Sequence, residues 1–208
     1  MSSKGTILLT GYEAFGDFKV NPSIAACMKL NGRKIGVYSV AVEEITMNFS
    51  GVKEAIEGHL ERYKPAAVVC TGVSGAGAVI AVERVAINVF SARGGVMGKE
   101  AQDAAIRDDG PVGYFTTLPY RRILEALKEA SIPARLSNSA GTVGCNLIFY
   151  YLMDYLARNG CDILAGFIHV PRLPEQALNG RSPSMSLEVS ASALEVAIGE
   201  LVSELKSD

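Results

Sequence analysis

Apolar segments of strand length alternate with segments of helical periodicity along the first third of the chain. Uncharged or loosely alternating runs at residues 5–11, 34–42 and 66–72 predict three strands. Between them, residues 21–30 open with Asn-Pro-Ser, a helix start signal, and residues 44–63 have an amphipathic pattern. We expect helices at both places. Strands that alternate with helices at this spacing favour a three-layer α/β/α sandwich around a mixed, mostly parallel twisted sheet.

Later in the chain, a long helical pattern is followed by an apolar run. Residues 146–158 carry apolar side chains at helical spacing and end at the stop signal Asn159-Gly160. Residues 161–171 then form an apolar run that stops at a proline, with His169 near its end. A helix of ~14 residues is about 21 Å long and a strand of ~7 residues about 23 Å. A strand that returns beside the helix therefore brings His169 to the helix N-terminus.

A cysteine stands where small and polar residues give way to this helix. Cys145 falls in the first turn, where unpaired amide N–H groups and the positive end of the helix dipole gather. Both stabilise negative charge on a thiol and leave backbone donors for an anion. The alternative is a cysteine that simply packs in the interior, which is common. The expected return of His169 favours a thiol nucleophile with an imidazole partner.

An acid and a base interrupt the apolar run at residues 79–89. Glu83 and Arg84 are adjacent there, and a charged pair inside such a run is costly unless both members are paired. One reading places the two side chains on opposite faces, with one of them exposed. The other gives Glu83 the task of orienting an imidazole, the third member of a thiol–imidazole arrangement. A structural ion pair remains an equal alternative on these residues alone.

Two loops follow predicted strands. Residues 12–20 contain Tyr12, Phe15 and Phe18 just past a strand end, where ligands bind in α/β sheets. These aromatic side chains either line a ligand site or cover the core. Residues 72–77 are rich in glycine but match neither a dinucleotide loop, nor a phosphate loop, nor the serine-hydrolase motif G-x-S-x-G. We interpret this second loop as a tight backbone turn.

Composition and charge exclude several classes of protein. The chain has 208 residues, of which 49% are hydrophobic and 20% charged, and this suits a single domain over residues 1–208. The net charge of -2, without a basic cluster that contains aromatics, argues against a nucleic-acid partner. Since no uncharged stretch is long enough to span a bilayer, we expect no membrane partner and a cytoplasmic location.

The cysteines and histidines are too few and too scattered for a disulfide scaffold or a zinc site. The four cysteines show no C-x-x-C spacing, so we expect reduced thiols. Only His59 and His169 are available as imidazole ligands, and His59 has the neighbours of a solvated surface residue. We therefore expect no metal site.

Five segments of the chain form a characteristic series. They are residues 10–16 with 20–23, residues 83–88, residues 113–119, residues 137–146, and residues 169–171 with 173–176. In the same order, and over the chain from about Ile7 to Glu188, these segments resemble the pyrrolidone-carboxylate peptidases, the pyroglutamyl peptidase I family of cysteine exopeptidases.

The resemblance implies an activity and a catalytic triad. Members of the family remove the N-terminal pyroglutamyl residue from peptides, so peptides of that kind are the expected partners. The family's nucleophile falls on Cys145, its histidine on His169 and its glutamate on Glu83. The reaction then runs through a thioester and uses no cofactor. By the same analogy we expect a homo-oligomer, a dimer or a tetramer.

The resemblance also implies substrate contacts. Tyr12 and Phe15 correspond to the aromatics that embrace the lactam ring, and Asn21 belongs to the adjoining matched segment. Arg93 corresponds to an arginine near the substrate carbonyl, where it and the backbone N–H of Cys145 are expected to stabilise the oxyanion.

The chain departs from the family pattern near these residues. Val143-Gly144 precedes the cysteine where a tyrosine and a valine are usual, and Tyr12 stands in place of a common phenylalanine. Ala14 replaces a proline, and residues 94–97 lack the usual character. The alternatives are a non-catalytic or altered-specificity relative that binds peptides, and a phosphorylase-like transferase, for which the sequence offers no convincing phosphate site.

Overall fold

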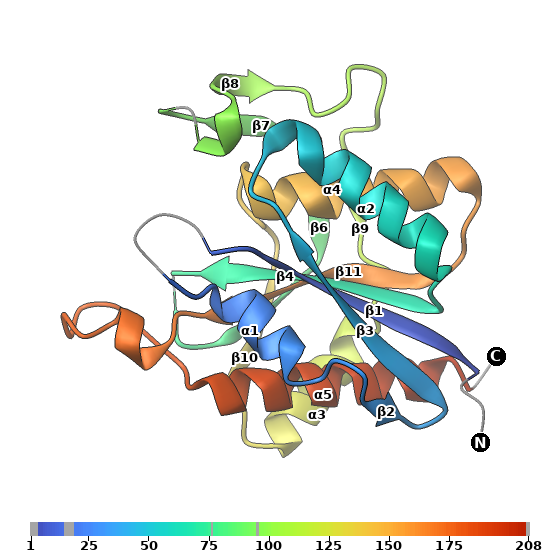
Figure 1. Ribbon diagram of the computed structural model, residues 1–208, viewed down its shortest axis with the longest axis vertical. Helices are drawn as coiled ribbons and strands as arrows, with labels where there is room; N and C mark the ends of the chain where they lie inside the picture. Colours follow the sequence, from blue (N-terminus) through green and yellow to red (C-terminus); the bar gives the residue numbers. More distant parts are fainter. Residues whose placement is uncertain (1–3, 15–18, 76, 95, 207–208) are drawn as a thin grey trace.

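A seven-stranded mixed sheet forms the centre of the molecule. The computed structural model describes residues 4–14, 19–75, 77–94 and 96–206. The strand order is β10-β5-β11-β4-β1-β3-β2 (Figure 1). The four strands β11, β4, β1 and β3 are parallel, β10 is parallel to β5, and β5 and β2 are antiparallel to β11 and β3. The bounds are β1 Gly5–Tyr12, β2 Lys34–Ile35, β3 Tyr38–Ile45, β4 Ala67–Ser74, β5 Ile80–Glu83, β10 Ala134–Ser137 and β11 Leu164–Pro171.

Helices cover both faces of this sheet (Figure 1). On one face lie α1 (Pro22–Met28), α3 (Tyr120–Glu129) and α5 (Leu187–Glu204). On the other face lie α2 (Phe49–Tyr63) and α4 (Gly144–Asn159). The expected three-layer α/β/α sandwich around a mixed, mostly parallel sheet is confirmed.

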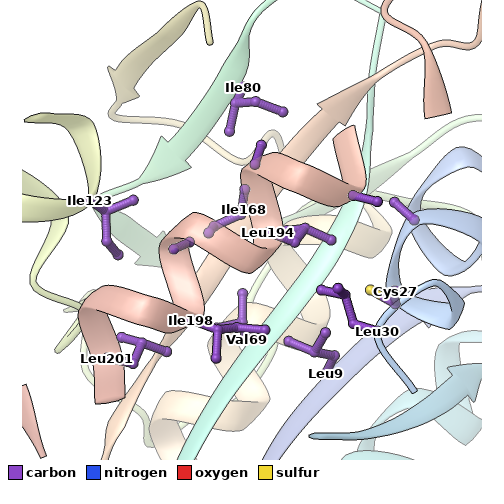
Figure 2. Packing of buried hydrophobic residues seen from close by; sticks show 14 of the residues in the cluster. Leu9, Cys27, Leu30, Val69, Ile80, Ile123, Ile168, Leu194, Ile198 and Leu201 are labelled. Atoms are coloured by element: carbon purple, nitrogen blue, oxygen red, sulfur yellow. The ribbon is translucent and has the colours of Figure 1, made fainter. Parts of the chain in front are cut away.

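The alternation of side chains along each strand separates the two cores. Leu9, Val69 and Ile168 point to the face of α1 and α5, where they pack with Leu194 and Ile198 (Figure 2). The intervening residues Leu8, Val68 and Phe167 point to the face of α2 and α4. Because these central strands are buried on both faces, they read in the sequence as continuous apolar runs.

Two small two-stranded sheets extend the α4 side of the molecule (Figure 1). β6 (Val85–Ile87) pairs with β9 (Gly113–Phe115), and β7 (Phe90–Ala92) pairs with β8 (Ala101–Ala104). Two short 3-10 turns, η1 (Val96–Gly98) and η2 (Pro174–Gln176), complete the elements.

Two predicted strands are divided in the structure. Residues 34–42 form a hairpin instead of one strand, because Gly36 turns the chain at φ 58° between β2 and β3. β3 then continues to Ile45, and the following helix begins at Phe49 behind an Asn48 cap instead of at residue 44. The run at residues 79–89 breaks at Arg84, whose backbone N–H and C=O bond Ser137 and Thr116 instead of a single partner strand.

Candidate active site

The start of α4 presents Cys145 with free backbone donors around it. Val143 is the N-cap residue, and its side chain makes no capping hydrogen bond. The first amide groups of a helix have no partner within the helix, so the N–H of Cys145 is available to an anion. Cys145 itself is half-buried, whereas Gly144 and Asn146 on either side are buried. The side chain therefore reaches a cavity from a fixed backbone.

Asn146 fixes this helix start to the neighbouring strand region. Its amide Oδ1 accepts a hydrogen bond from the Ile87 N–H at 2.9 Å, and its Nδ2 donates to the carbonyls of Ile87 and Val89 at 2.9 and 3.0 Å. Asn146 is fully buried, and these three bonds satisfy the amide as a buried polar group requires. The sequence analysis attached no role to Asn146; the one signal was its place beside Cys145 in a matching segment.

Glycine at position 72 makes room for the thiol. A Cβ atom there would lie 2.7 Å from Sγ of Cys145 and 2.8 Å from Cζ of Phe167. Gly72 ends the buried part of β4, and its direct partner on β11 is His169. The thiol therefore rests over the sheet beside the strand that carries His169, as the lengths of the helix and the strand predict. The glycine-rich loop therefore begins at Gly72, where the Cys145 thiol lies too close to the backbone of β4 for a side chain.

His169 lies between the thiol and a buried carboxylate. Its Nδ1 is 2.8 Å from Oε1 of Glu83, and both side chains are almost fully buried. β5 runs antiparallel to β11, with Phe167 opposite Glu83 and His169 opposite Ala81, so the carboxylate and the imidazole lie on one face. The edge of Phe167 also packs on the His169 ring, at 4.8 Å between centroids. The Glu83 carboxylate and the Phe167 ring therefore both fix the orientation of the His169 imidazole.

The surroundings favour a charged imidazole. Burial lowers the pKa of His169, but the charge and hydrogen bond of Cys145 and those of Glu83 outweigh it and raise the pKa to about 9. The second carboxylate oxygen of Glu83 is buried without a hydrogen-bond partner among the described residues. Glu83 thus bonds His169 through one carboxylate oxygen, while the other oxygen is buried. The ion-pair reading with Arg84 has no support, since the carboxylate bonds the imidazole.

One cavity connects these three side chains. It has a volume of about 370 Å³, and Cys145, His169 and Glu83 all line it. Its remaining walls come from the loop before α4 and the loop after β4, with one charged residue from β10. These residues are Val73, Ser74, Gly75, Arg135, Ser139, Ala140, Gly141, Thr142, Val143 and Gly144.

Tyr12 lies beneath the turn that carries the thiol. Its side chain is 1% exposed, and its hydroxyl donates a hydrogen bond to the Gly144 carbonyl at 2.5 Å. Burial, followed by the charges of Cys145 and Cys70, raises the pKa of Tyr12, so the phenol keeps its proton. A Cβ atom on Gly144 would approach the sulfurs of Met47 and Met97 at 3.0 and 3.3 Å. The two departures at Tyr12 and Gly144 are thus in direct contact, and a lactam contact of Tyr12 stays a prediction.

The other expected substrate contacts are dispersed. Asn21 is buried as the cap of α1, where it accepts from the Ser23 N–H and donates to the Glu13 carbonyl at 3.0 Å each. It also lines a smaller cavity of about 130 Å³ with Arg172 and Gln176. Arg93 is exposed just after β7. Phe15 lies outside the described residues, so its role as a ring wall is untested by the geometry.

A known protein family matches the chain over almost its whole length. The family model described as pyroglutamyl peptidase matches residues 5–204. The chain belongs to the pyroglutamyl peptidase family. The resemblance seen in the five sequence segments is thereby confirmed over almost the entire chain.

Relatives of the pyroglutamyl peptidase family agree in sequence and in structure. Pyrrolidone-carboxylate peptidases of Brevibacillus brevis and Bacillus licheniformis are 42% and 41% identical, over 95% and 92% of this chain and 93% and 89% of theirs. The crystal structure of Bacillus amyloliquefaciens pyroglutamyl peptidase I has a TM-score of 0.93 at 37% identity, covering 96% of this chain and 98% of that one. Pyrrolidone carboxyl peptidase from Thermococcus litoralis also scores 0.93, at 33% identity, covering 98% and 96%.

The described residues contain no group of three or more His, Cys, Asp or Glu side chains that could hold a metal ion. Within the same residues, none of the helices combines the length and the apolar character needed to cross a membrane.

Proposed function

We propose that this chain is a cysteine exopeptidase that releases N-terminal pyroglutamate from peptides through Cys145, His169 and Glu83. The observation that carries the proposal is the arrangement of a thiol at a helix N-terminus, an imidazole whose pKa is raised, and a buried carboxylate on its Nδ1. A nucleophile, a base and an orienting group within one cavity are the parts that acyl transfer requires. Membership of the pyroglutamyl peptidase family supplies the substrate class.

The reaction begins with proton transfer from the Cys145 thiol to His169. Sulfur attacks the pyroglutamyl carbonyl carbon, a C–S bond forms, and negative charge develops on the carbonyl oxygen. The backbone N–H of Cys145 at the start of α4 is positioned to stabilise that oxyanion. From the resemblance we assign Arg93 to the same oxygen, which requires its exposed side chain to fold over the site.

The second half returns every group to its starting state. His169 gives its proton to the leaving amine as the C–N bond breaks, and the shortened peptide departs. A water molecule then loses a proton to His169 and attacks the thioester, releasing pyroglutamate and restoring the thiol. Throughout, Glu83 holds the imidazole by its Nδ1 and stabilises its positive charge, so Nε2 faces the reacting atoms.

Specificity for pyroglutamate tests this function against its alternatives. A pocket that hydrogen-bonds the lactam N–H and C=O leaves polar groups unpaired when proline, which lacks the ring carbonyl, takes its place. We expect kcat/KM on a chromogenic pyroglutamyl amide to exceed that on the matched prolyl amide by several orders of magnitude. Phe15→Ala should impair only the pyroglutamyl reaction. Equal rates on both amides would mean an altered specificity, and binding without turnover would mean a non-catalytic protein.

A further inference from the structure

The catalytic cavity continues past the triad to a cationic side chain. Arg135 on β10 lines the same cavity as Cys145, His169 and Glu83. It is exposed, and no described residue forms an ion pair or side-chain hydrogen bond with its guanidinium group. Besides His169, Arg135 is the one basic side chain among the described residues that line this cavity.

Strand register places Arg135 at the level of the imidazole. Ala81 on β5 is the direct partner of both His169 on β11 and Arg135 on β10. Since direct partners in a sheet share a face, His169 and Arg135 lie on the same face as Ala81, and both line the cavity. Neighbouring strands are about 4.8 Å apart, which puts the Cα atoms of His169 and Arg135 about 10 Å apart. Ala81, the residue between them on β5, has a small and buried side chain, so no large side chain of β5 stands between His169 and Arg135.

The strand order assigns the two ends of the cavity to the two parts of a substrate. Tyr12 ends β1, which lies two strands from β11 on one side, and Arg135 lies two strands away on the other. Tyr12 is buried beneath the turn that carries Cys145 and is not part of the cavity lining. The resemblance puts the lactam ring on the β1 side. With the scissile bond over Cys145, the leaving peptide then extends toward β10. We propose that Arg135 binds the free α-carboxylate of this leaving peptide, an inference that rests on the proposed function. The preferred substrates are then short pyroglutamyl peptides.

The distances fit a peptide of two or three residues. Successive Cα atoms are 3.8 Å apart in a trans peptide, so the carboxylate of a pyroglutamyl tripeptide lies roughly 8 Å beyond the pyroglutamyl Cα. The arginine side chain is long enough to meet it across Ala81. A guanidinium fork matches a carboxylate with two parallel hydrogen bonds, which a lysine cannot reproduce. Longer peptides carry their carboxylate past Arg135 and lose the contact.

The groups that face Arg135 define a competing arrangement. In the cavity the facing charges are Glu83 on β5 and His169 on β11, while the loop before α4 contributes the neutral Ser139 and Thr142. One oxygen of Glu83 has no partner. If Arg135 served that oxygen, it would act on the triad and not on the substrate. The two arrangements differ in whether the effect of Arg135 depends on a charge at the substrate C-terminus.

The experiment compares pyroglutamyl-alanyl-alanine with its C-terminal amide for wild type, Arg135→Gln and Arg135→Lys. We expect the free acid to have a kcat/KM about five-fold higher at low ionic strength, about 1 kcal/mol by the relation of 1.4 kcal/mol per factor of ten. An exposed pair reaches no more than about this value. The ratio of acid to amide should fall to about one in Arg135→Gln, remain intermediate in Arg135→Lys, and shrink at high salt. Arg121→Gln on α3 removes an equal charge elsewhere and should keep the wild-type ratio.

Each result that contradicts the carboxylate site can be distinguished from a failure of the proposed function. A wild-type ratio of one, with the amide still cleaved, overturns the carboxylate site and leaves the peptidase assignment standing. An equal loss on acid and amide in Arg135→Gln assigns Arg135 to Glu83 and also overturns the inference. If wild type cleaves neither peptide, the proposed function itself fails.

Discussion

Replacing Glu83 by glutamine tests how His169 is held in its charged form. The carboxylate and the imidazole Nδ1 are 2.8 Å apart and almost fully buried. A hydrogen bond to a charged group contributes roughly 1.5–3 kcal/mol, and one between neutral groups about 1 kcal/mol. Glu83→Gln therefore removes about 0.5–2 kcal/mol of stabilisation from the imidazolium. That loss lowers the pKa of His169 by about one.

The pH dependence gives this change a direction. Protonated His169 predominates below its pKa of about 9 and is lost as the pH rises through it. In the variant the alkaline limb of kcat should move down by about one pH unit. A further loss arises because the amide can present its NH2 group to Nδ1 and favour the wrong tautomer, an effect worth roughly 10⁴-fold in a serine-protease triad. We expect kcat to fall by between about tenfold and that limit, with KM little changed.

The assay is the pH profile of pyroglutamyl amide hydrolysis, with the Tm of each variant as a check on folding. Glu195→Gln is the matched control. Glu195 lies on α5, in the layer opposite α4, and forms an exposed ion pair with Arg33. Such exposed pairs contribute little to stability. Glu195→Gln should keep the wild-type kcat and the wild-type position of the alkaline limb in the pH profile. A folded Glu83→Gln variant with the wild-type kcat and an unmoved limb would refute the reasoning and make Glu83 a purely structural residue.

Four further predictions concern the surroundings of the triad. Iodoacetamide should abolish activity by labelling Cys145. Labelling of the exposed Cys161 should leave activity unchanged, and an activity loss that follows Cys161 labelling would contradict this. Gly72→Ala should reduce kcat and lower the free energy of unfolding by about 1–3 kcal/mol, because the added methyl group overpacks the site beside the thiol. Wild-type values in activity assays and urea unfolding would contradict this. Tyr12→Phe should lower kcat several-fold by freeing the Gly144 carbonyl, as steady-state kinetics would show. Burial raises the pKa of Asp154, but hydrogen bonds from Tyr114, Arg158 and Arg107 outweigh it and lower the pKa, so Asp154→Asn should cost about 1.5–3 kcal/mol at pH 7. The cost should shrink as the pH falls below about 4, where the carboxyl of the unfolded chain protonates, and disappear once the folded carboxyl protonates at still lower pH; a pH-independent cost would contradict this.

The central layers of the fold follow from the sequence because their signals are local. Buried strands such as β4 and β11 are continuous apolar runs, and the Asn21 cap precedes α1 as predicted. The predicted start of α2 at residue 44 is wrong, because β3 continues to Ile45 and Asn48 is the cap. Residue 84 illustrates the limit. One apolar run continues through it, yet its backbone groups bond two distant segments, Ser137 and Thr116. Hydrogen bonds to such distant segments leave no signal in the local hydrophobic pattern. The helices α3 and α5 also lie outside the predicted elements.

The thiol–imidazole pair was predictable for a geometric reason, and the substrate contacts were not. The lengths of α4 and β11 bring Cys145 and His169 together, whereas the adjacent pair Glu83-Arg84 leaves an ion pair as an equal alternative and the resemblance assigns Glu83 to the histidine. For Tyr12 the residue type indicates an aromatic wall, but the side chain lies under the nucleophile turn and bonds the Gly144 carbonyl. That contact depends on the absence of a side chain at position 144, which no periodicity encodes.

The most direct test of the account is to trap the acyl-enzyme. Rapid acid quenching during turnover of a pyroglutamyl ester should yield protein heavier by one pyroglutamyl acyl group, and peptide mapping should place the thioester on Cys145. Cys145→Ala should remove the adduct, while Cys161→Ser should retain it. An adduct on another residue, or hydrolysis at the wild-type rate by Cys145→Ala, would contradict the assignment of Cys145 as the nucleophile.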